Sequence, residues 1–209
     1  RAGGHTSVKI ERIRLKNFKV FQDETFTDLP GFVVLVGANG TGKSTLFDVF
    51  GFLRDCLKDN IRSALQRRGG FSEVVSRGHS AENIEIELQV RMQMVKKERL
   101  VTYLLEISNA EGKPTIEREV LRYKRGASGA PFHFLDFSRG EGKAITNESE
   151  FASDLELTVE HQELDSPDIL AIKGLGQFQK FLAASAFRSL IENWHVSDFH
   201  INSARSSPD

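Results

Sequence analysis

The most informative part of the sequence is residues 32–45, which read FVVLVGANGTGKST. The first five of these residues form a continuous apolar run, which is typical of a strand buried on both faces of a sheet. After the turn, Leu46, Phe50, Leu53 and Leu57 recur at intervals of four, three and four, and this spacing predicts an amphipathic helix. The sequence therefore predicts a buried strand, a glycine-rich turn and a helix in direct succession.

The glycine-rich turn, residues 37–44, matches the pattern G-x-x-x-x-G-K-[ST]. Glycines at this spacing let consecutive backbone N–H groups converge on phosphate oxygens, and the following helix directs its positive dipole end at the same anion. We expect Lys43 to reach the β and γ phosphates as the catalytic lysine and the Ser44 hydroxyl to bind Mg²⁺. The predicted cofactors are ATP and Mg²⁺. The predicted nucleotide-binding residues are Asn39, Gly40, Thr41, Gly42, Lys43, Ser44 and Thr45.

The composition excludes several classes of protein. The chain has 209 residues with 28 Lys and Arg against 29 Asp and Glu, and the formal net charge of -1 argues against a polyanion binder held by bulk charge. No apolar run approaches the roughly 20 residues needed to span a bilayer, so we expect a cytoplasmic protein without a membrane segment. The single cysteine, Cys56, is expected to be a small buried apolar residue, and the six histidines lie too far apart in sequence to predict a metal site.

Most of the remaining sequence predicts an antiparallel sheet with one exposed face. The clearest strand is residues 84–94, where six apolar residues alternate strictly with polar ones. Residues 83–147 should form an antiparallel meander, after a loop with a short irregular element at 67–78. Apolar residues from Ala183 to Trp194 predict an amphipathic helix. Residues 8–21 are expected to form an opening strand or one arm of a hairpin. Further strands are expected at 101–107, 115–124, 132–137, 143–147 and 196–201, with turns at 96–99, 111–114 and 138–142.

Three segments carry a resemblance to a known family: the Asn39-Gly40 pair inside the glycine-rich turn, the preceding stretch Ile10–Lys19, and the helix at Leu46–Leu53. Together they resemble ABC-type ATPases of the SMC, RecF and OLD group, specifically over Val8–Leu57 and elsewhere mainly in the order of elements. The resemblance implies an α/β P-loop fold with a mixed sheet and an inserted antiparallel lobe. It also implies a head-to-tail homodimer that holds two ATP molecules between the Walker A motif of one subunit and the signature motif of the other.

The resemblance implies that residues 1–209 are the N-terminal part of an ABC-type ATPase domain. Residues 8–66 would form the Walker A core, 83–147 the antiparallel lobe, and 168–202 a helix and a return strand. The Walker B and signature motifs of the family are not found, and we expect them beyond the end of the chain. Two segments imitate them. Asp136 ends an apolar run but lacks the glutamate that should follow, and Phe137–Glu141 is interpreted as a hairpin turn.

The resemblance also suggests two further site residues. Lys19 occupies the position of a basic residue that lies near the adenine in this family; alternatively, it is a solvated lysine at the end of a strand. A glutamine after the antiparallel lobe contacts Mg²⁺ in such proteins. We prefer Gln177 over Gln162 and Gln179 as this metal contact because it opens the last predicted helix, although a surface glutamine is the simpler interpretation.

The sequence leaves three functions open. The first is an ATPase that works as a dimer in DNA maintenance or phage defence, and the second is a nucleotide-dependent interaction module that recruits a nuclease or DNA without turnover. A small-molecule phosphotransferase is disfavoured by the family resemblance. DNA is a candidate partner because two groups of basic residues are of a kind that contacts phosphates, although a solvated surface is the favoured interpretation of both. They are Arg62, Arg67, Arg68 and Arg77, and Lys96, Lys97 and Arg99.

Overall fold

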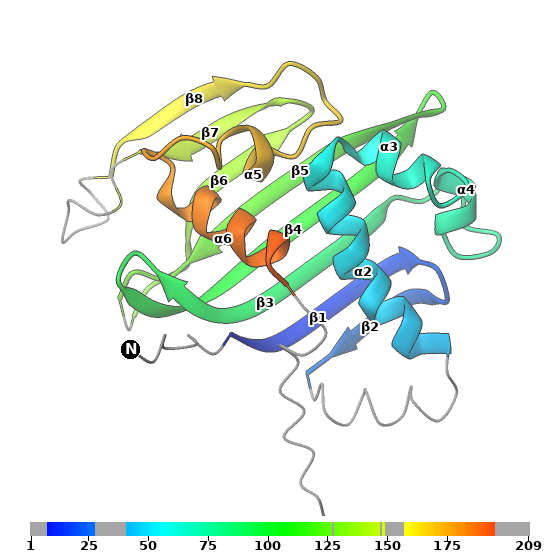
Figure 1. Cartoon of the computed structure of the whole chain (residues 1–209), viewed down its shortest axis with the longest axis horizontal. Helices are drawn as coiled ribbons and strands as arrows, with labels where there is room; N and C mark the ends of the chain where they lie inside the picture. The colour runs from blue at the N-terminus through cyan, green and yellow to red at the C-terminus, as the bar shows by residue number, and fades with distance from the viewer. Residues whose placement is uncertain (1–7, 28–40, 127, 147, 149–156, 195–209) are drawn as a thin grey trace, which may run out of the picture.

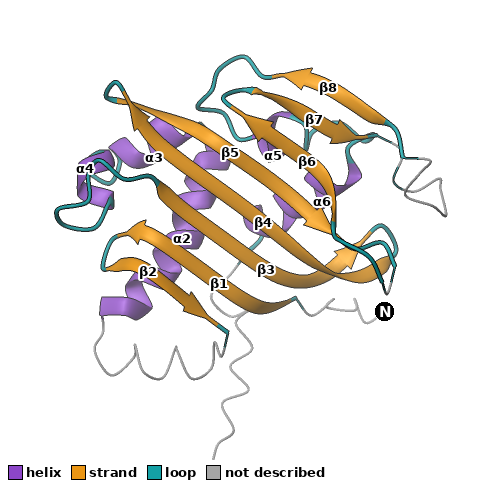
Figure 2. Ribbon diagram, turned by 180° about the vertical axis from the view of Figure 1, so that it is seen from behind, coloured by secondary structure: helices purple, strands orange, loops and turns teal. Residues whose placement is uncertain are grey.

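The computed structural model describes residues 8–27, 41–126, 128–146, 148 and 157–194, with the backbone alone for 41–47. These residues form one eight-stranded sheet in the order β2-β1-β3-β4-β5-β6-β7-β8, in which every neighbouring pair is antiparallel. Helices α2, α3, α5 and α6 lie over one face of the sheet, as the front and back views show (Figures 1 and 2). The opposite face carries no helix of the described part of the chain.

The elements have the following bounds. The strands are β1 (Lys9–Phe18), β2 (Phe21–Phe26), β3 (Ile84–Met94), β4 (Lys97–Ala110), β5 (Lys113–Tyr123), β6 (Phe132–Ser138), β7 (Glu141–Ile145) and β8 (Val159–Glu163). The helices are α2 (Thr41–Lys58), α3 (Ile61–Gln66), α4 (Phe71–Val74), α5 (Ala171–Gly174) and α6 (Leu182–Glu192).

Alternation of apolar and polar residues places the core between the sheet and the helices. In β3 the six apolar residues are all buried, whereas the polar residues between them are partly or fully exposed, and the predicted strand at 84–94 is confirmed to the residue. The predicted apolar face of β4 is also confirmed, because Val101, Tyr103, Leu105 and Ile107 are fully buried. This period of two leaves one face of the sheet polar, as the sequence predicted.

The hairpin turns are shorter than predicted. Each of three turns has only two residues between its strands, and both of them have positive φ, as a type I′ turn requires. These turns are Val95–Lys96, Glu111–Gly112 and Arg139–Gly140. Type I′ turns match the right-handed twist of the flanking strands, so strand pairing continues into residues that the sequence pattern assigned to turns. The predicted turns at 96–99, 111–114 and 138–142 are therefore wrong in length.

The first strand and the meander belong to one sheet. β1 pairs with β2 on one side and with β3 on the other, so the predicted antiparallel lobe continues directly into the strand that opens the chain. The division into residues 8–66, 83–147 and 168–202 stays a prediction. The strands predicted at 32–36 and 196–201 lie outside the described residues, and the mixed character of the sheet therefore also stays a prediction.

Helix α2 is the long helix predicted after the glycine-rich turn. Phe50, Leu53 and Leu57 are buried on its inner face, as their spacing predicted. The ring of Phe50 stacks on Trp194, which follows α6, with centroids 4.5 Å apart and planes 6° from parallel. The predicted amphipathic helix before Trp194 is confirmed as α6. α2 and α6 therefore pack side by side over the sheet.

Two buried carboxylates bind the starts of the C-terminal helices. Glu119 on β5 accepts hydrogen bonds from the backbone N–H groups of Ala171 and Ile172 at 2.5 and 3.1 Å and from the Tyr103 hydroxyl at 2.9 Å. Glu148 does the same for α6, accepting from Ala183 N and from the Tyr123 hydroxyl. Burial raises the pKa of each carboxyl to about 7, although the hydrogen bonds act in the opposite direction.

These raised pKa values make stability depend on pH. An unfolded glutamate loses its proton near its ordinary pKa of 4.5, whereas folded Glu119 keeps it to about 7. The folded state therefore binds more protons between these two values, and stability falls as the pH rises through that window. We expect the free energy of unfolding, measured with urea at about pH 5 and about pH 7.5, to depend less on pH in Glu119→Gln, by roughly 2 kcal/mol. Glu163→Gln, at an exposed site on β8, is the control. Unchanged pH dependence in Glu119→Gln would contradict the assignment.

Candidate functional site

The predicted phosphate-binding loop meets the described structure at the start of α2. Gly37 to Gly40 lie outside the described residues, and α2 begins at Thr41, so the helix predicted to follow the loop is confirmed. The side chains of residues 41–47, including Lys43 and Ser44, also lie outside the described part of the structure. The contacts of Asn39, Gly40, Thr41, Gly42, Lys43, Ser44 and Thr45 with a nucleotide therefore stay predictions.

Lys19 lies next to the first turns of α2. It stands in the turn between β1 and β2, and its Nζ atom is 2.6 Å from Oδ2 of Asp48. Asp48 follows Ser44 by four residues, which places the two residues one above the other on the same side of the helix. Lys19 is thus an ion-paired lysine within about one helical turn of the predicted magnesium ligand. Lys19 is partly exposed as well as ion-paired, so both interpretations of this lysine stay predictions.

The turn that carries Lys19 is fixed by a buried amide. Asn17 is fully buried and has φ of 55°, and its side-chain nitrogen donates to His79 O and Glu82 O, both at 2.9 Å. The Asn17 side-chain oxygen accepts from Ser76 N at 3.1 Å, and the Ser76 hydroxyl donates to Lys19 O at 2.6 Å. Asparagine tolerates this left-handed backbone better than most residues. These hydrogen bonds hold the turn against the loop that follows α4.

Arg68 connects α2 to the end of α3. Its guanidinium donates to Asp48 at 3.2 Å, to Asp55 at 2.8 Å and to Ala64 O at 3.0 Å, and it lies over the Phe52 ring. Asp48 therefore contacts both Lys19 and Arg68. Sequence reasoning did not identify Asp48 or Asn17, because their partners are distant in the sequence. The only feature of the sequence that pointed to this region was the Asn-Phe-Lys segment at residues 17–19.

The first basic group proposed to contact nucleic acid is mostly engaged within the protein. Arg68 is bound as above, Arg67 pairs with Asp55, and Arg62 donates to Pro114 O and lies 3.7 Å from Asp168. These contacts cancel the local charge that a phosphate would need. The interpretation of this group as ordinary protein surface is therefore favoured. Of its four arginines, Arg77 alone is exposed and forms no ion pair with another described residue.

Gln177 does not open the last helix. It lies between α5 and α6, its side chain is exposed, and its amide nitrogen donates to Gly174 O at 3.2 Å. The helix begins five residues later, at Leu182, where the buried Glu148 accepts from the N–H of Ala183. The structural reason given for preferring Gln177 is therefore wrong, and its contact with Mg²⁺ stays a prediction.

The segments that imitate other motifs have structural roles. Asp136 is on β6, where it accepts from Arg118 at 3.3 Å and lies 3.1 Å from His133 Nδ1. Phe137–Glu141 contains the two-residue hairpin turn between β6 and β7, as predicted. Cys56 is buried as predicted, and burial raises the pKa of its thiol well above the ordinary value. Among the described residues, no group of three or more His, Cys, Asp or Glu side chains is arranged to hold a metal ion.

Comparison with known proteins identifies the family of the chain. A family model described as an AAA domain matches residues 12–195. The chain belongs to the AAA-domain family. The matched range of this AAA domain includes the predicted phosphate-binding loop, α2, and the whole of strands β3 to β8. The suspected family is thereby confirmed, and the fold is that of a P-loop NTPase rich in β-sheet.

One curated relative of the AAA domain is the DNA replication and repair protein RecF of Clavibacter michiganensis subsp. michiganensis (strain NCPPB 382). It is 25% identical over 126 residues, and the match covers 58% of this chain but only 29% of that protein. No solved structure matches the chain significantly. Within the described residues, none of the helices has the length and apolar character needed to cross a membrane.

Asn17 is the residue whose loss should most disturb the site. Replacing it by Ala removes three hydrogen bonds and leaves a residue that does not favour φ of 55°. We expect Asn17→Ala to lower the free energy of unfolding by roughly 3 kcal/mol, because buried partners lose their hydrogen bonds as well. Urea unfolding measures the change. Asn193→Ala, which removes exposed local contacts near the end of α6, should cost less than about 1 kcal/mol, and equal losses in the two variants would contradict the role of Asn17.

Proposed function

We propose that the chain binds ATP·Mg²⁺ through residues 37–45, and that the complete protein hydrolyses ATP as a nucleotide-closed homodimer. The observation that carries this proposal is the G-x-x-x-x-G-K-S match directly before α2, in a chain that belongs to the AAA-domain family. Because the chain belongs to this family, we do not attribute the G-x-x-x-x-G-K-S match to chance. Coupling of hydrolysis to a conformational change follows from the same family resemblance.

The start of α2 fits a bound nucleotide. α2 has 18 residues, so its aligned peptide dipoles give its N-terminus a partial positive charge, and the first N–H groups of a helix have no partner within it. Phosphate oxygens satisfy both properties. Lys43 would contact the β and γ phosphates, and the Ser44 hydroxyl would hold Mg²⁺, whose charge neutralises the phosphoryl oxygens. The oxygen of a hydroxyl can bind Mg²⁺, and an ammonium group can donate hydrogen bonds to phosphate oxygens.

Lys19 and Gln177 are proposed as the next contacts. The ion pair with Asp48 supports a position of Lys19 beside the nucleotide, because it holds the ammonium group about one turn from Ser44. We assign Lys19 to the adenine side of the site. Gln177 is proposed as a contact to Mg²⁺. Its hydrogen bond to Gly174 O is made by the side-chain amide nitrogen. A metal would bind the side-chain amide oxygen, which takes no part in that hydrogen bond.

The proposed setting is DNA maintenance or phage defence in the cytoplasm. The printed name of the RecF relative supports DNA replication and repair as the broader process, although the match covers only 29% of that protein. A second candidate is a module that binds nucleotide without hydrolysing it and recruits a nuclease or DNA. It is favoured by the contacts of Asp136, the nearest imitation of a Walker B carboxylate in the sequence, with Arg118 and His133. Release of inorganic phosphate by the complete protein separates the two functions.

Lys43 should contribute most of the binding energy from a single side chain. We expect Lys43→Ala to weaken ATP binding by roughly tenfold to a hundredfold, because it removes charge-assisted hydrogen bonds worth about 1.5 to 3 kcal/mol. Isothermal titration calorimetry measures the affinity. Asp136→Ala is the control, since its carboxylate contacts Arg118 and His133 on the sheet, and it should bind ATP as wild type does. Equal affinity in wild type and Lys43→Ala would refute the proposed site.

Ser44 should act through the metal and not through the phosphates. We expect Ser44→Ala to bind ATP nearly as well as wild type in EDTA, and to show a smaller gain in affinity when Mg²⁺ is added, because the lost hydroxyl is a metal ligand. Titrations with and without EDTA measure both affinities. An identical response to Mg²⁺ in the two proteins would exclude Ser44 as a ligand.

A further inference from the structure

The lysine in the turn between β1 and β2 has a fixed backbone and a side chain that contacts α2. The N–H group of Lys19 donates to Val74 O at 2.7 Å, and the carbonyl oxygen of Lys19 accepts from the Ser76 hydroxyl at 2.6 Å. Its side chain leaves this turn and places Nζ 2.6 Å from Oδ2 of Asp48. The loop after α4 therefore holds the main chain of Lys19, whereas Asp48 is the carboxylate that holds its ammonium group among the described residues.

Asp48 divides its two carboxylate oxygens between two cations. Its Oδ1 atom accepts from Nε of Arg68 at 3.2 Å, and its Oδ2 atom faces Lys19. The Arg68 side chain is 16% exposed and is fixed by further hydrogen bonds to Asp55 and to Ala64 O. The Lys19 side chain is 36% exposed. Arg68 is therefore the fixed partner of Asp48, and Lys19 is the partner that a ligand can reach.

The ion pair leaves Lys19 able to bind a second acceptor. An ammonium group has three N–H donors, and the contact with Asp48 occupies one side of it. Asp48 follows Ser44 by four residues, so it holds this ammonium group beside the first turns of α2, next to the predicted phosphate-binding loop. A ring nitrogen or a ribose oxygen of a nucleotide could accept from Lys19 without displacing Asp48.

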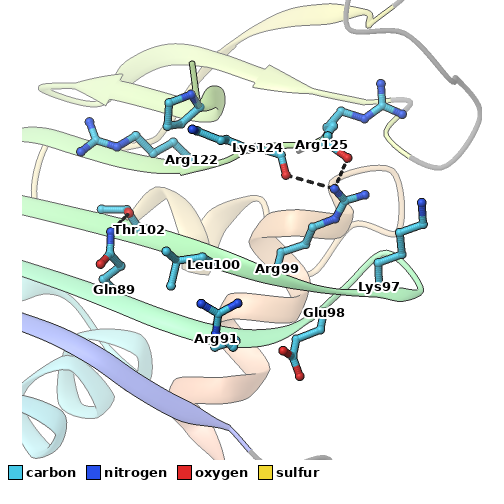
Figure 3. A pocket seen from close by; sticks show the side chains of 12 residues that line it. Gln89, Arg91, Lys97, Glu98, Arg99, Leu100, Thr102, Arg122, Lys124 and Arg125 are labelled. Carbon is cyan, nitrogen blue, oxygen red and sulfur yellow. Dashed lines mark hydrogen bonds between the residues drawn. The ribbon is translucent and has the colours of Figure 1, made fainter. Parts of the chain in front are cut away.

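The arginine of the second basic group considered for DNA is engaged within the protein. Arg99 on β4 donates to Lys124 O at 3.0 Å and to Arg125 O, and both hydrogen bonds are drawn as dashed lines in Figure 3. The pocket around Arg99, with a volume of about 710 Å³, also contains Arg91, which pairs with Glu11 at 3.1 Å. These contacts favour the interpretation of this group as protein surface. Lys19 differs, because its ion pair lies beside the candidate nucleotide site.

We propose that Asp48 is a positioning residue that holds Lys19 for a hydrogen bond to the nucleoside part of ATP. The proposal rests on the proposed nucleotide site at residues 37–45. Arg68 keeps Asp48 in place, Asp48 keeps the ammonium group in place, and of these three groups only the ammonium group contacts the ligand. Asp48 thereby sets how much the nucleoside adds to the affinity that the triphosphate provides.

The test measures the ratio of two affinities of the complete protein, that for ATP over that for inorganic triphosphate, both with Mg²⁺. Isothermal titration calorimetry gives both affinities. Removing a negative charge near the phosphates strengthens the binding of both ligands, and a general loss of structure weakens both, so neither effect changes the ratio much. A change in the ratio therefore reports the contact between Lys19 and the nucleoside.

Asp48→Asn is the informative variant, because an amide offers one acceptor oxygen where the carboxylate offers two. Arg68 is the more buried cation and loses more without an acceptor, so we expect the amide oxygen to stay with Arg68 and the amide nitrogen to face Lys19. The ratio should fall by roughly fivefold to tenfold, as for one lost hydrogen bond. Lys19→Ala should lower it equally, and Lys19→Ala/Asp48→Asn should lower it no further.

Asp55→Asn is the matched control. It makes the same substitution on the same helix and removes a contact of Arg68, but the described side-chain contacts of Asp55 are with Arg67 and Arg68. Its ratio should stay within about twofold of wild type. Circular dichroism verifies that the variants fold. If Asp48→Asn does not fold, Asp48→Glu replaces it, since it keeps the charge but moves the carboxylate, and it should lower the ratio by at least about twofold.

The outcomes separate this inference from the proposed function. An unchanged ratio in Asp48→Asn, an equal fall in Asp55→Asn, or a further fall in the double variant would overturn the role of Asp48. In each of these cases, ATP binding that Lys43→Ala weakens would leave the proposed nucleotide site standing. A wild-type protein that binds neither ATP nor triphosphate would reject the nucleotide site and the role of Asp48 together.

Discussion

The structure around the candidate site depends on the buried side chain of Asn17. Its amide makes three hydrogen bonds to backbone groups of residues 76, 79 and 82, and so it joins the end of β1 to the loop after α4. This contact sets the position of Lys19, which pairs with Asp48 on α2, while Arg68 binds the same aspartate from the end of α3. Three separate segments therefore meet at the first turns of α2. A helix held in this way can present fixed N–H groups to an anion.

The other end of α2 is connected to the sheet through α6. Glu148 accepts from both the Tyr123 hydroxyl and Ala183 N, so the sheet determines where α6 begins. α6 then leads to Trp194, which stacks on Phe50 of α2 and whose carbonyl oxygen accepts from Arg54. Glu119 repeats this device with Tyr103 and α5. At both helix starts the accepting group is a carboxylate whose pKa burial raises to about 7, so its protonation state depends on pH near neutrality.

Local patterns in the sequence predicted local structure well. The alternation at 84–94 and the spacing of Phe50, Leu53 and Leu57 depend only on neighbouring residues, and both predictions are confirmed. The turn between β3 and β4 was misjudged because Val95 and Lys96 adopt positive φ, a conformation for which the sequence there offers no asparagine or glycine as a signal. The Lys19 and Asp48 ion pair, the Asn17 contacts and the pairing of β1 with β3 join residues distant in the sequence. Periodicity carries no information about such contacts, whereas a phosphate-binding loop is recognisable because its chemistry requires adjacent residues.

Ion pairs compensate cations on both faces of the sheet. On the helix side, Asp48 and Asp55 pair with Lys19, Arg67 and Arg68 and so compensate part of their charge. On the opposite face, Arg91 pairs with Glu11 and Arg122 lies 3.8 Å from Glu87. A net charge close to zero argues only against attraction of a polyanion by the charge of the whole chain. Charges at distances beyond about 10 Å are largely screened at physiological salt, so a phosphate responds to the local surface and not to the sum over the chain.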